Sequence, residues 1–173
     1  MSHSDTDSAI RTRRALSTDL ERIEAIYSEA RRYMRARGNF AQWSELYPSA
    51  QTAIADMRRG WCHVIEADGR VVATFCLMTE PEPTYAALVE ALTVPYVTLH
   101  RVASDGTVPG ILAEAVSYTR RLHDCDIRID THADNAPMLT AIRRLGFSPT
   151  GPITLADGSP RLSFRLRHDT DRI

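Results

Sequence analysis

The sequence predicts an α/β protein: an α+β arrangement in which a mixed β-sheet carries helices on both faces. Two observations support this class. Segments with apolar residues at helical spacing alternate with short apolar runs of strand type, in the order β-α-α-β-β-β-α-β-α-β-β. At 173 residues the chain is long enough for one domain with a sizeable core. We therefore expect one domain over residues 9–168, with a disordered leader over 1–8 and a tail over 169–173.

The N-terminal part predicts one strand and two helices. A strand over 9–15 precedes a helix over 20–37, whose start shows the capping-box spacing of Thr18 and Glu21. A loop with exposed-looking aromatic residues follows. A second helix is expected over 49–58.

A β-hairpin follows these helices. The strand-like runs 61–67 and 71–78 are separated by Asp68-Gly69, which is a strong signal for a tight hairpin turn. The Glu-Pro-Glu-Pro segment at 80–83 then ends the sheet strand and begins a loop.

The centre of the chain predicts a βαβ unit. The strand over 96–103 is almost continuously apolar, which favours a central position in the sheet. It leads through a turn with Gly106 and Gly110 into a helix over 108–122. Such a turn can aim backbone N–H groups at an anion, although most units of this kind bind nothing. The remaining elements are a strand over 126–132, a helix over 135–145 and a hairpin of strands 147–155 and 161–167.

Composition excludes several classes of function. The formal net charge of −1 does not favour nucleic-acid binding. All 21 basic residues are arginines, so this chain supplies no lysine for Schiff-base chemistry. The 3 cysteines, without a CxxC pair, favour buried thiols in a reducing compartment. No apolar run approaches the roughly 18 residues of a membrane span, and the start lacks the apolar core of a signal peptide, so a cytoplasmic location is expected.

Several short segments of the sequence resemble the motifs of a known family and follow one another in the same order along the chain. They are Leu99-His-Arg-Val-Ala103 with the Gly110 turn; Ile127-Arg-Ile-Asp-Thr-His132; Asn135-Ala-Pro-Met138; Arg144-Leu-Gly-Phe147; Gln42-Trp43; Tyr47-Pro48; and Asp157-Gly-Ser-Pro-Arg161. Together they resemble the GCN5-related N-acetyltransferase (GNAT) family, and the last three resemble a bacterial branch of small acetyltransferases. The resemblance covers about residues 9–167.

This resemblance implies acetyl-CoA as co-substrate, no metal, and a small-molecule or amino-acid-like amine as acceptor, which attacks directly in a ternary complex. It places pantetheine along the strand backbone and the pyrophosphate on N–H groups of the turn. The implied cofactor-binding residues are Arg101, Val102, Ala103, Thr107, Val108, Gly110, Ile111, Leu112, Asn135 and Met138.

The sequence also departs from the family pattern. The family's basic or amide residue is replaced by Thr107, and its last small residue by Leu112. Pro109 lacks an N–H group but suits the first turn of a helix, and Asp105 adds negative charge near the expected pyrophosphate. Ile142 occupies the position at which many members carry an acidic tyrosine. A GNAT-fold binding or regulatory module without turnover is therefore the alternative.

Acetyl transfer to an amine requires a base, and four residues are candidates. An unperturbed histidine has a pKa near 6.5, which suits a base, so His100 is a candidate, but it could equally brace the sheet together with Arg101. Asp130 and His132 lie two residues apart and so share a strand face. Glu80, at a strand end, is a further candidate.

Aromatic residues are candidates for the acceptor side. Trp43, Tyr47 and Tyr96 could line the pocket for the amine, although a surface aromatic loop can instead cover the core or form a dimer contact. The expected partner is thus a small-molecule amine, with a homodimer as a further option and without nucleic acid or membrane.

Overall fold

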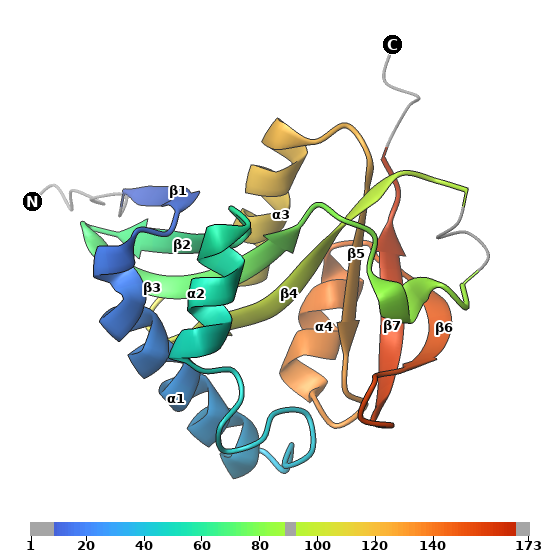
Figure 1. Ribbon diagram of the computed structural model, residues 1–173, viewed down its shortest axis with the longest axis horizontal. Coiled ribbons are helices and arrows are strands. Elements are labelled where there is room, and N and C mark those ends of the chain that lie inside the picture. The colour runs from blue at the N-terminus through green and yellow to red at the C-terminus, as the bar shows by residue number, and fades with distance from the viewer. Residues whose placement is uncertain (1–8, 89–92, 169–173) are drawn as a thin grey trace, which may run out of the picture.

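The computed structural model describes residues 9–88 and 93–168, so the expected leader and tail lie outside the described residues. A seven-stranded mixed sheet runs through the molecule in the order β1-β2-β3-β4-β5-β7-β6 (Figure 1). Neighbouring strands are antiparallel except β4 and β5, which are parallel. The strands are β1 Ile10–Arg14, β2 Cys62–Ala67, β3 Arg70–Met78, β4 Tyr96–Ser104, β5 Asp126–Thr131, β6 Ser148–Thr154 and β7 Pro160–Leu166. The predicted mixed sheet is confirmed.

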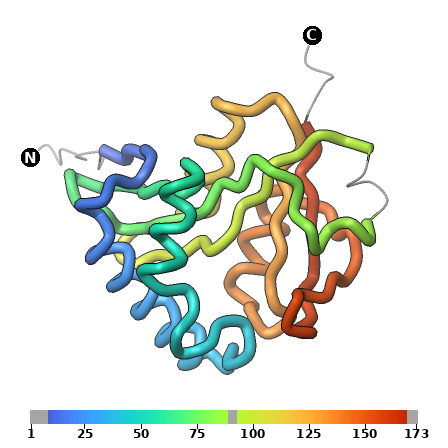
Figure 2. Tube along the Cα trace, viewed as in Figure 1, coloured from blue at the N-terminus to red at the C-terminus, as the bar shows by residue number. Residues whose placement is uncertain are grey.

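Two helices cover each face of the sheet (Figures 1 and 2). On one face, α1 (Leu20–Ala36) and α2 (Ala50–Arg58) pack a smaller core around Ile23, Ile26 and Tyr27. On the other face, α3 (Ile111–Leu122) and α4 (Ala136–Arg144) close the larger core, which includes Phe75, Leu99, Ile129 and Ile142. The apolar spacing that predicted these helices corresponds to the sides that they bury.

The strands β4 and β5 pair over only part of their length. Their parallel register runs from Tyr96 opposite Asp126 to Leu99 opposite Ile129 and then stops, although both strands continue. The two traces separate beyond this point (Figure 2). Because strand backbone groups seek partners, the part of β4 after Leu99 can offer N–H and C=O groups to a ligand on its β5 side.

A β-bulge lies on β4 at the start of this gap. The β3–β4 register shifts between Thr74 and Cys76, and Arg101 has a left-handed φ of 51°. Bulges turn a strand and redirect its side chains. The bulge therefore aims His100 and Arg101 at different neighbours near the centre of the molecule.

The predicted capping box at the first helix is wrong. A short 3-10 helix, η1 (Ser17–Asp19), precedes α1, and Asp19 accepts a hydrogen bond of 2.7 Å from the N–H of Leu16. Asp19 also forms an ion pair of 2.7 Å with Arg13. The carboxylate of Asp19 thus ties the start of the helix to β1 and replaces the predicted Thr18–Glu21 pair.

The third helix begins later than predicted. Gly110 is the residue before α3 and has a left-handed φ of 76°, so Pro109 lies in the turn and not in the first helical turn. A left-handed residue cannot belong to a right-handed helix, and glycine adopts this conformation without steric cost. A second short 3-10 helix, η2 (Pro83–Tyr85), lies where the sequence predicted only a loop.

Candidate active site

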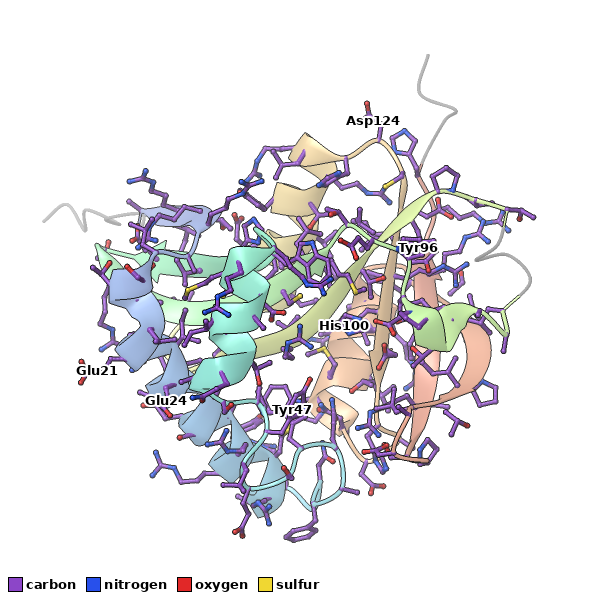
Figure 3. All side chains as sticks on the ribbon, in the orientation of Figure 1. Glu21, Glu24, Tyr47, Tyr96, His100 and Asp124 are labelled. Atoms are coloured by element: carbon purple, nitrogen blue, oxygen red, sulfur yellow. The ribbon has the colours of Figure 1, made fainter. Side chains whose placement is uncertain are left out.

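A cavity of about 260 Å³ opens where β4 and β5 diverge. We call it the acceptor-side cavity. Its floor is formed by the two strands, and its walls come from the loop between α1 and α2, from η2 and from the β6–β7 hairpin. Figure 3 shows His100 near the middle of the sheet and Tyr47 on the loop that follows α1. The lining combines charged, aromatic and apolar side chains, which is typical of a ligand site.

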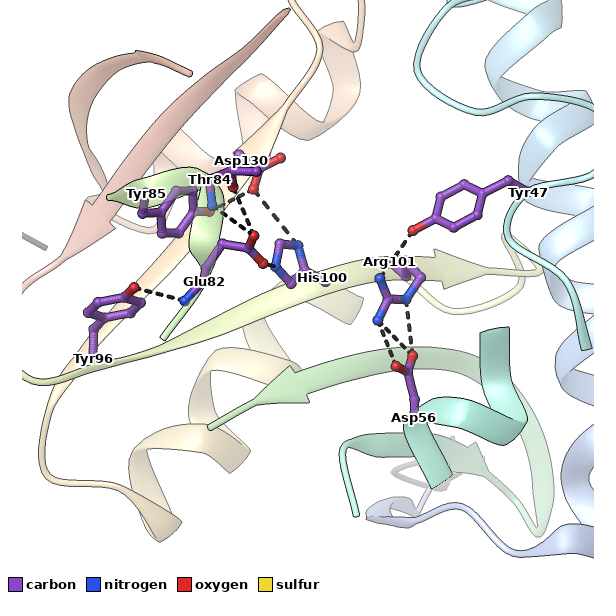
Figure 4. A network of polar contacts seen from close by, with 9 residues as sticks. All are labelled: Tyr47, Asp56, Glu82, Thr84, Tyr85, Tyr96, His100, Arg101 and Asp130. Carbon is purple, nitrogen blue, oxygen red and sulfur yellow. Dashed lines mark hydrogen bonds and ion pairs between the residues drawn. The ribbon is translucent and has the colours of Figure 1, made fainter. Parts of the chain in front are cut away.

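His100 lies between two carboxylates in this cavity (Figure 4). Its Nε2 is 2.8 Å from Oε2 of Glu82, and its Nδ1 is 3.8 Å from Oδ2 of Asp130. An ionised carboxylate can only accept, so in the neutral imidazole Nε2–H donates to Glu82 and Nδ1 keeps a lone pair. The 3.8 Å separation is too long for a hydrogen bond, which leaves Nδ1 able to accept a proton.

Glu82 is held from several directions. Its carboxylate accepts hydrogen bonds from the N–H of Thr84 at 3.2 Å and from the hydroxyl of Thr84 at 2.9 Å. Its own N–H donates to the Tyr96 hydroxyl at 3.0 Å. Burial alone raises the pKa of Glu82, but the hydrogen bond and positive charge of His100 and the bonds from Thr84 outweigh it and lower the pKa to about 2. Glu82 is therefore ionised at neutral pH.

Asp130 is fixed by a buried tyrosine. The Tyr85 hydroxyl donates to Oδ2 of Asp130 at 2.6 Å, and Tyr85 is 0% exposed. Burial, followed by the charge of Asp130, raises the pKa of Tyr85 well above its ordinary value, so the phenol remains a donor. The short helix η2 and the residue that caps it thus supply two side chains to this network. Glu82 contacts His100, and Tyr85 contacts Asp130.

Arg101 uses its side chain to join three elements. Its guanidinium forms a two-pronged ion pair with Asp56 of α2, with contacts of 3.0 and 2.8 Å, and donates to the Tyr47 hydroxyl at 3.1 Å (Figure 4). Bidentate pairs of this kind fix geometry as well as charge. The side chain of Arg101 therefore braces the loop that carries Tyr47, and only its backbone remains for a ligand.

A second cavity, of about 370 Å³, lies beside the first. We call it the donor-side cavity. It is bounded by the last part of β4, the C-terminal half of α1, the start of α3 and the first turns of α4. The two cavities share the lining residues Met34, Val102, Asn135 and Met138, so they meet at the divergence of the two strands. A long ligand could reach from one cavity into the other.

The turn before α3 is partly occupied by its own side chains. The N–H of Gly106 donates to the Ser104 hydroxyl and that of Thr107 to Asp105, each at 2.9 Å. The N–H of Thr107 therefore already has an acceptor in this turn, and its expected role toward a pyrophosphate stays a prediction. The charge of Asp105 is balanced by ion pairs to Arg22 at 2.5 Å and Arg70 at 2.6 Å.

The structure brings many of the predicted residues to these cavities. His100 and Asp130 meet in the acceptor-side cavity, where Trp43 and Tyr47 also line the wall. The donor-side cavity is lined by the predicted residues Val102, Ala103, Ile111, Leu112, Asn135 and Met138. Their roles in binding and catalysis stay predictions.

Other predicted residues lie elsewhere. The side chain of Glu80 is 62% exposed and pairs with Arg59 at 3.2 Å. His132 follows β5 and accepts a hydrogen bond from the N–H of Asp134. Neither residue lines either cavity, and the same holds for Tyr96, Thr107, Val108 and Gly110. Val108 and Gly110 instead line a separate groove beside β1.

Several residues of the acceptor-side cavity or its support were not among the predicted site residues, including Glu82, Tyr85, Gln42 and Arg161. A local signal existed for Glu82, because an acceptor side chain followed by proline is typical of a helix start, and Glu82 does cap η2. Gln42 and Arg161 are 119 residues apart and meet only through the tertiary fold.

Within residues 9–88 and 93–168, no cluster of three or more metal-ligating His, Cys, Asp or Glu side chains occurs. Over the same residues, no helix has the length and apolar character needed to cross a membrane.

Solved structures show what this fold is similar to. An acetyltransferase of the GNAT family from Streptococcus agalactiae superposes with a TM-score of 0.81 at 24% identity, covering 93% of this chain and 96% of that one. A GNAT-family acetyltransferase from Listeria monocytogenes gives 0.69 at 17% identity, with coverages of 91% and 94%. The structure of yncA from Salmonella typhimurium with its cofactor acetyl-CoA gives 0.60 at 17% identity, with coverages of 95% and 97%.

No protein-family model and no curated protein sequence matches the chain. The structural likenesses therefore establish the fold, which is that of the GNAT acyltransferases, as the sequence predicted.

Proposed function

We propose that the protein is an acyltransferase that moves an acetyl group from acetyl-CoA to a primary amine of a small molecule. One observation carries this proposal. The pairing of β4 with β5 stops after Leu99 and Ile129, and the gap joins one cavity lined by an imidazole and carboxylates to another lined mainly by backbone and apolar groups. Two reactants of different chemistry can thus meet at one point.

The donor-side cavity has the features that an acyl-CoA requires. The unpaired part of β4 presents backbone groups on which a pantetheine amide chain can add like an extra strand. Ile111 and Leu112 lie in the first turn of α3, where helix N–H groups lack intrahelical partners and favour an anion. Arg22 and Arg70 form ion pairs with Asp105, so the negative charge of Asp105 is balanced and does not repel a phosphate group.

The acceptor-side cavity has the groups that an amine requires. We assign His100 as the base, with Nδ1 receiving the proton from the attacking amine. The amine nitrogen forms a bond to the thioester carbon, the carbon–sulfur bond breaks, and the thiolate leaves with the electron pair and takes up a proton. Glu82 and Asp130 stabilise the imidazolium that forms on His100.

The leaving group has no tyrosine on α4 to protonate it, because Ile142 stands at that position and is 0% exposed. A thiol has an ordinary pKa near 8.5, so the thiolate can leave without an acid.

The experiment combines acetyl-CoA binding with transfer. Acetyl-CoA at 100 times its dissociation constant is expected to stabilise the fold by about 2.7 kcal/mol, measured by thermal unfolding. A panel of primary amines is then tested for release of the CoA thiol, with a reaction lacking amine to measure hydrolysis. No stabilisation at millimolar acetyl-CoA would contradict the proposal.

A second candidate is a binding module of the same fold without turnover. It is favoured by the occupied N–H of Thr107 in the turn and by the buried Ile142 on α4. Stabilisation by acetyl-CoA without thiol release for any amine in the panel would support this second candidate.

A further inference from the structure

Arg161 places a buried positive charge at the wall of the acceptor-side cavity. This residue of β7 is 6% exposed and lines the cavity. Its guanidinium donates to the backbone oxygen of Gln42 at 2.8 Å, to that of Pro160 at 2.8 Å and to the Ser159 hydroxyl at 3.3 Å. All these acceptors are neutral. Burying a charge costs free energy unless the charge is paired. An anionic group of a ligand bound in the cavity would therefore stabilise Arg161.

No carboxylate within the described part of the chain forms an ion pair with Arg161. Asp157, on the same hairpin, is exposed, and its pKa is lowered mainly by the hydrogen bonds from Ser159 and to a smaller extent by the charge of Arg161, without an ion pair between the two side chains. The other arginine of the cavity, the half-buried Arg101, differs in this respect, because Asp56 balances its charge. Among the described arginines that line this cavity, Arg161 is thus the one without a carboxylate in ion-pair contact.

Gln42 also lines the cavity and carries a side-chain amide. Its side-chain oxygen accepts from Asn39 at 2.9 Å, from Asn135 at 2.9 Å and from the Thr131 hydroxyl at 3.3 Å. The orientation of Asn135 is set by α4, since its side-chain oxygen accepts the N–H of Met138. The amide nitrogen of Asn135 therefore faces Gln42 and donates to the Gln42 side-chain oxygen. The amide nitrogen of Gln42 is thus not used in the contact with Asn135.

The same cavity also has an acidic part. Glu82 and Asp130 lie there on either side of His100. A cavity lined by carboxylates and by a buried guanidinium is complementary to a small molecule that carries both an ammonium and a carboxylate. The volume of about 260 Å³ is just below the range of about 300–1,000 Å³ typical of drug-sized ligands, so a small acceptor fits.

We propose that the guanidinium of Arg161 and the side-chain amide of Gln42 bind the carboxylate of the acceptor, so that the preferred acceptors are free amino acids and not amines that lack a carboxylate. This inference rests on the proposed function of the same cavity. The carboxylate supplies an ion-pair partner for Arg161, while the amino group of the same molecule faces His100. Arginine suits this role because its planar fork of donors matches a carboxylate.

The test compares amino acids with the amines that lack only the carboxylate. The pairs are leucine with 3-methylbutylamine, phenylalanine with 2-phenylethylamine, and methionine with 3-(methylthio)propylamine. Binding is measured by calorimetry in the presence of CoA, and transfer by thiol release from acetyl-CoA. The variants are Arg161→Met, Gln42→Glu and, as a matched control on the exposed end of the same hairpin, Arg167→Met.

At least one amino acid is expected to bind more tightly than its amine partner. Arg161→Met is expected to weaken that amino acid about 10- to 100-fold, the usual value of hydrogen bonds to a charged group, and to change the amine less than about threefold. Gln42→Glu keeps an oxygen for the three donors but places a charge at the cavity, so it should weaken amino acids and spare amines. Arg167→Met should change neither.

The inference is overturned if wild-type protein binds every amine as well as its amino acid, or if Arg161→Met weakens both members of a pair equally. Amino-acid binding that depends on Arg161 without any thiol release would retain the inference and contradict the proposed function alone. Circular dichroism of each variant identifies a folding defect, and Gln42→Glu provides a second test if Arg161→Met fails to fold.

Discussion

The two cavities beside β4 differ in what lines them. In the acceptor-side cavity, His100 lies between the carboxylates of Glu82 and Asp130, which accept hydrogen bonds from other side chains. In the donor-side cavity, the lining is rich in small and apolar residues such as Ala103, Gly106 and Leu112, beside an unpaired strand backbone. Val102 lines both cavities, so the two cavities adjoin each other.

This difference suggests how the fold divides recognition from chemistry. Backbone groups are present in every sequence, so a ligand bound by them tolerates substitution of side chains that it does not touch. A proton-transfer network depends on particular side chains at particular distances. We therefore expect substitutions in the donor-side cavity to act through shape, and substitutions in the acceptor-side cavity to act through charge and hydrogen bonding.

The largest effect on acetyl-CoA binding is expected from filling the donor-side cavity. Ala141 of α4 lines this cavity, and Ala141→Trp should block it because the indole occupies the space of the ligand. We expect acetyl-CoA affinity to fall about 100-fold or more, measured by calorimetry. The control is Ala113→Trp on the exposed side of α3, which lies outside the cavity and should retain affinity. Equal affinity in both variants would place the cofactor elsewhere.

A smaller effect is expected from removing one charge of the network. Glu82→Gln keeps the shape but loses the carboxylate that accepts from His100. A hydrogen bond to a charged group contributes about 1.5–3 kcal/mol, so kcat should fall about 10- to 100-fold. Glu80→Gln, two residues away and exposed, is the matched control and should keep the wild-type rate. A fall in kcat for Glu80→Gln together with a wild-type kcat for Glu82→Gln would mean that Glu80, and not Glu82, is the carboxylate that supports catalysis.

The same substitution predicts a pH dependence of stability. The pKa of Glu82 falls from an ordinary 4.5 to about 2 in the folded protein, so the carboxylate stabilises the fold above pH 4.5 and this contribution is lost as pH falls through about 2. Because Glu82 is partly exposed to solvent, the contribution is on the order of 1–2 kcal/mol. Urea unfolding of wild type and Glu82→Gln should show a difference near pH 6 that narrows toward pH 2. A constant difference would contradict the low pKa.

Removing the hydroxyl of Tyr85 should have a moderate effect. Tyr85→Phe deletes the donor to Asp130 without changing the packing of the ring. We expect kcat to fall about 5- to 10-fold and the free energy of unfolding to fall by about 1 kcal/mol, measured by thiol release and urea unfolding. Tyr118→Phe, whose ring packs with His63 and Phe75, should leave kcat unchanged. A wild-type kcat in Tyr85→Phe would show that the hydrogen bond from Tyr85 to Asp130 is not needed for catalysis.

The smallest effect is expected at the turn before α3. Thr107 bonds to Asp105 and lines neither cavity, so Thr107→Ala should change acetyl-CoA affinity less than about threefold. A much larger loss would mean that the turn rearranges around the ligand.

The sequence predicted the elements well because their signals are local. The apolar spacing that defines α1 and the Asp68-Gly69 hairpin depend on neighbours within a few residues. Element ends depended on single backbone conformations, such as the left-handed Gly110 that delays α3. No local signal distinguishes a proline before a helix from one within its first turn.

The site could be predicted only where it lies on regular elements. His100 and Asp130 stand on adjacent parallel strands, so their meeting follows from the topology. The choice between Glu80 and Glu82 depends on the short helix η2, which turns Glu82 toward His100 and leaves Glu80 outside. The contact of Arg161 with Gln42 joins distant parts of the chain and has no local signal.

The most direct test of the account measures two constants on the same variant. His100→Ala should lower kcat for thiol release about 10²- to 10⁴-fold, while the dissociation constant of acetyl-CoA changes less than about threefold. His132→Ala, which alters a histidine outside both cavities, should keep both constants near wild type. A full rate for His100→Ala across pH 6–9 would contradict the assignment of the base. A loss of acetyl-CoA binding in His100→Ala would contradict the separation of the two cavities.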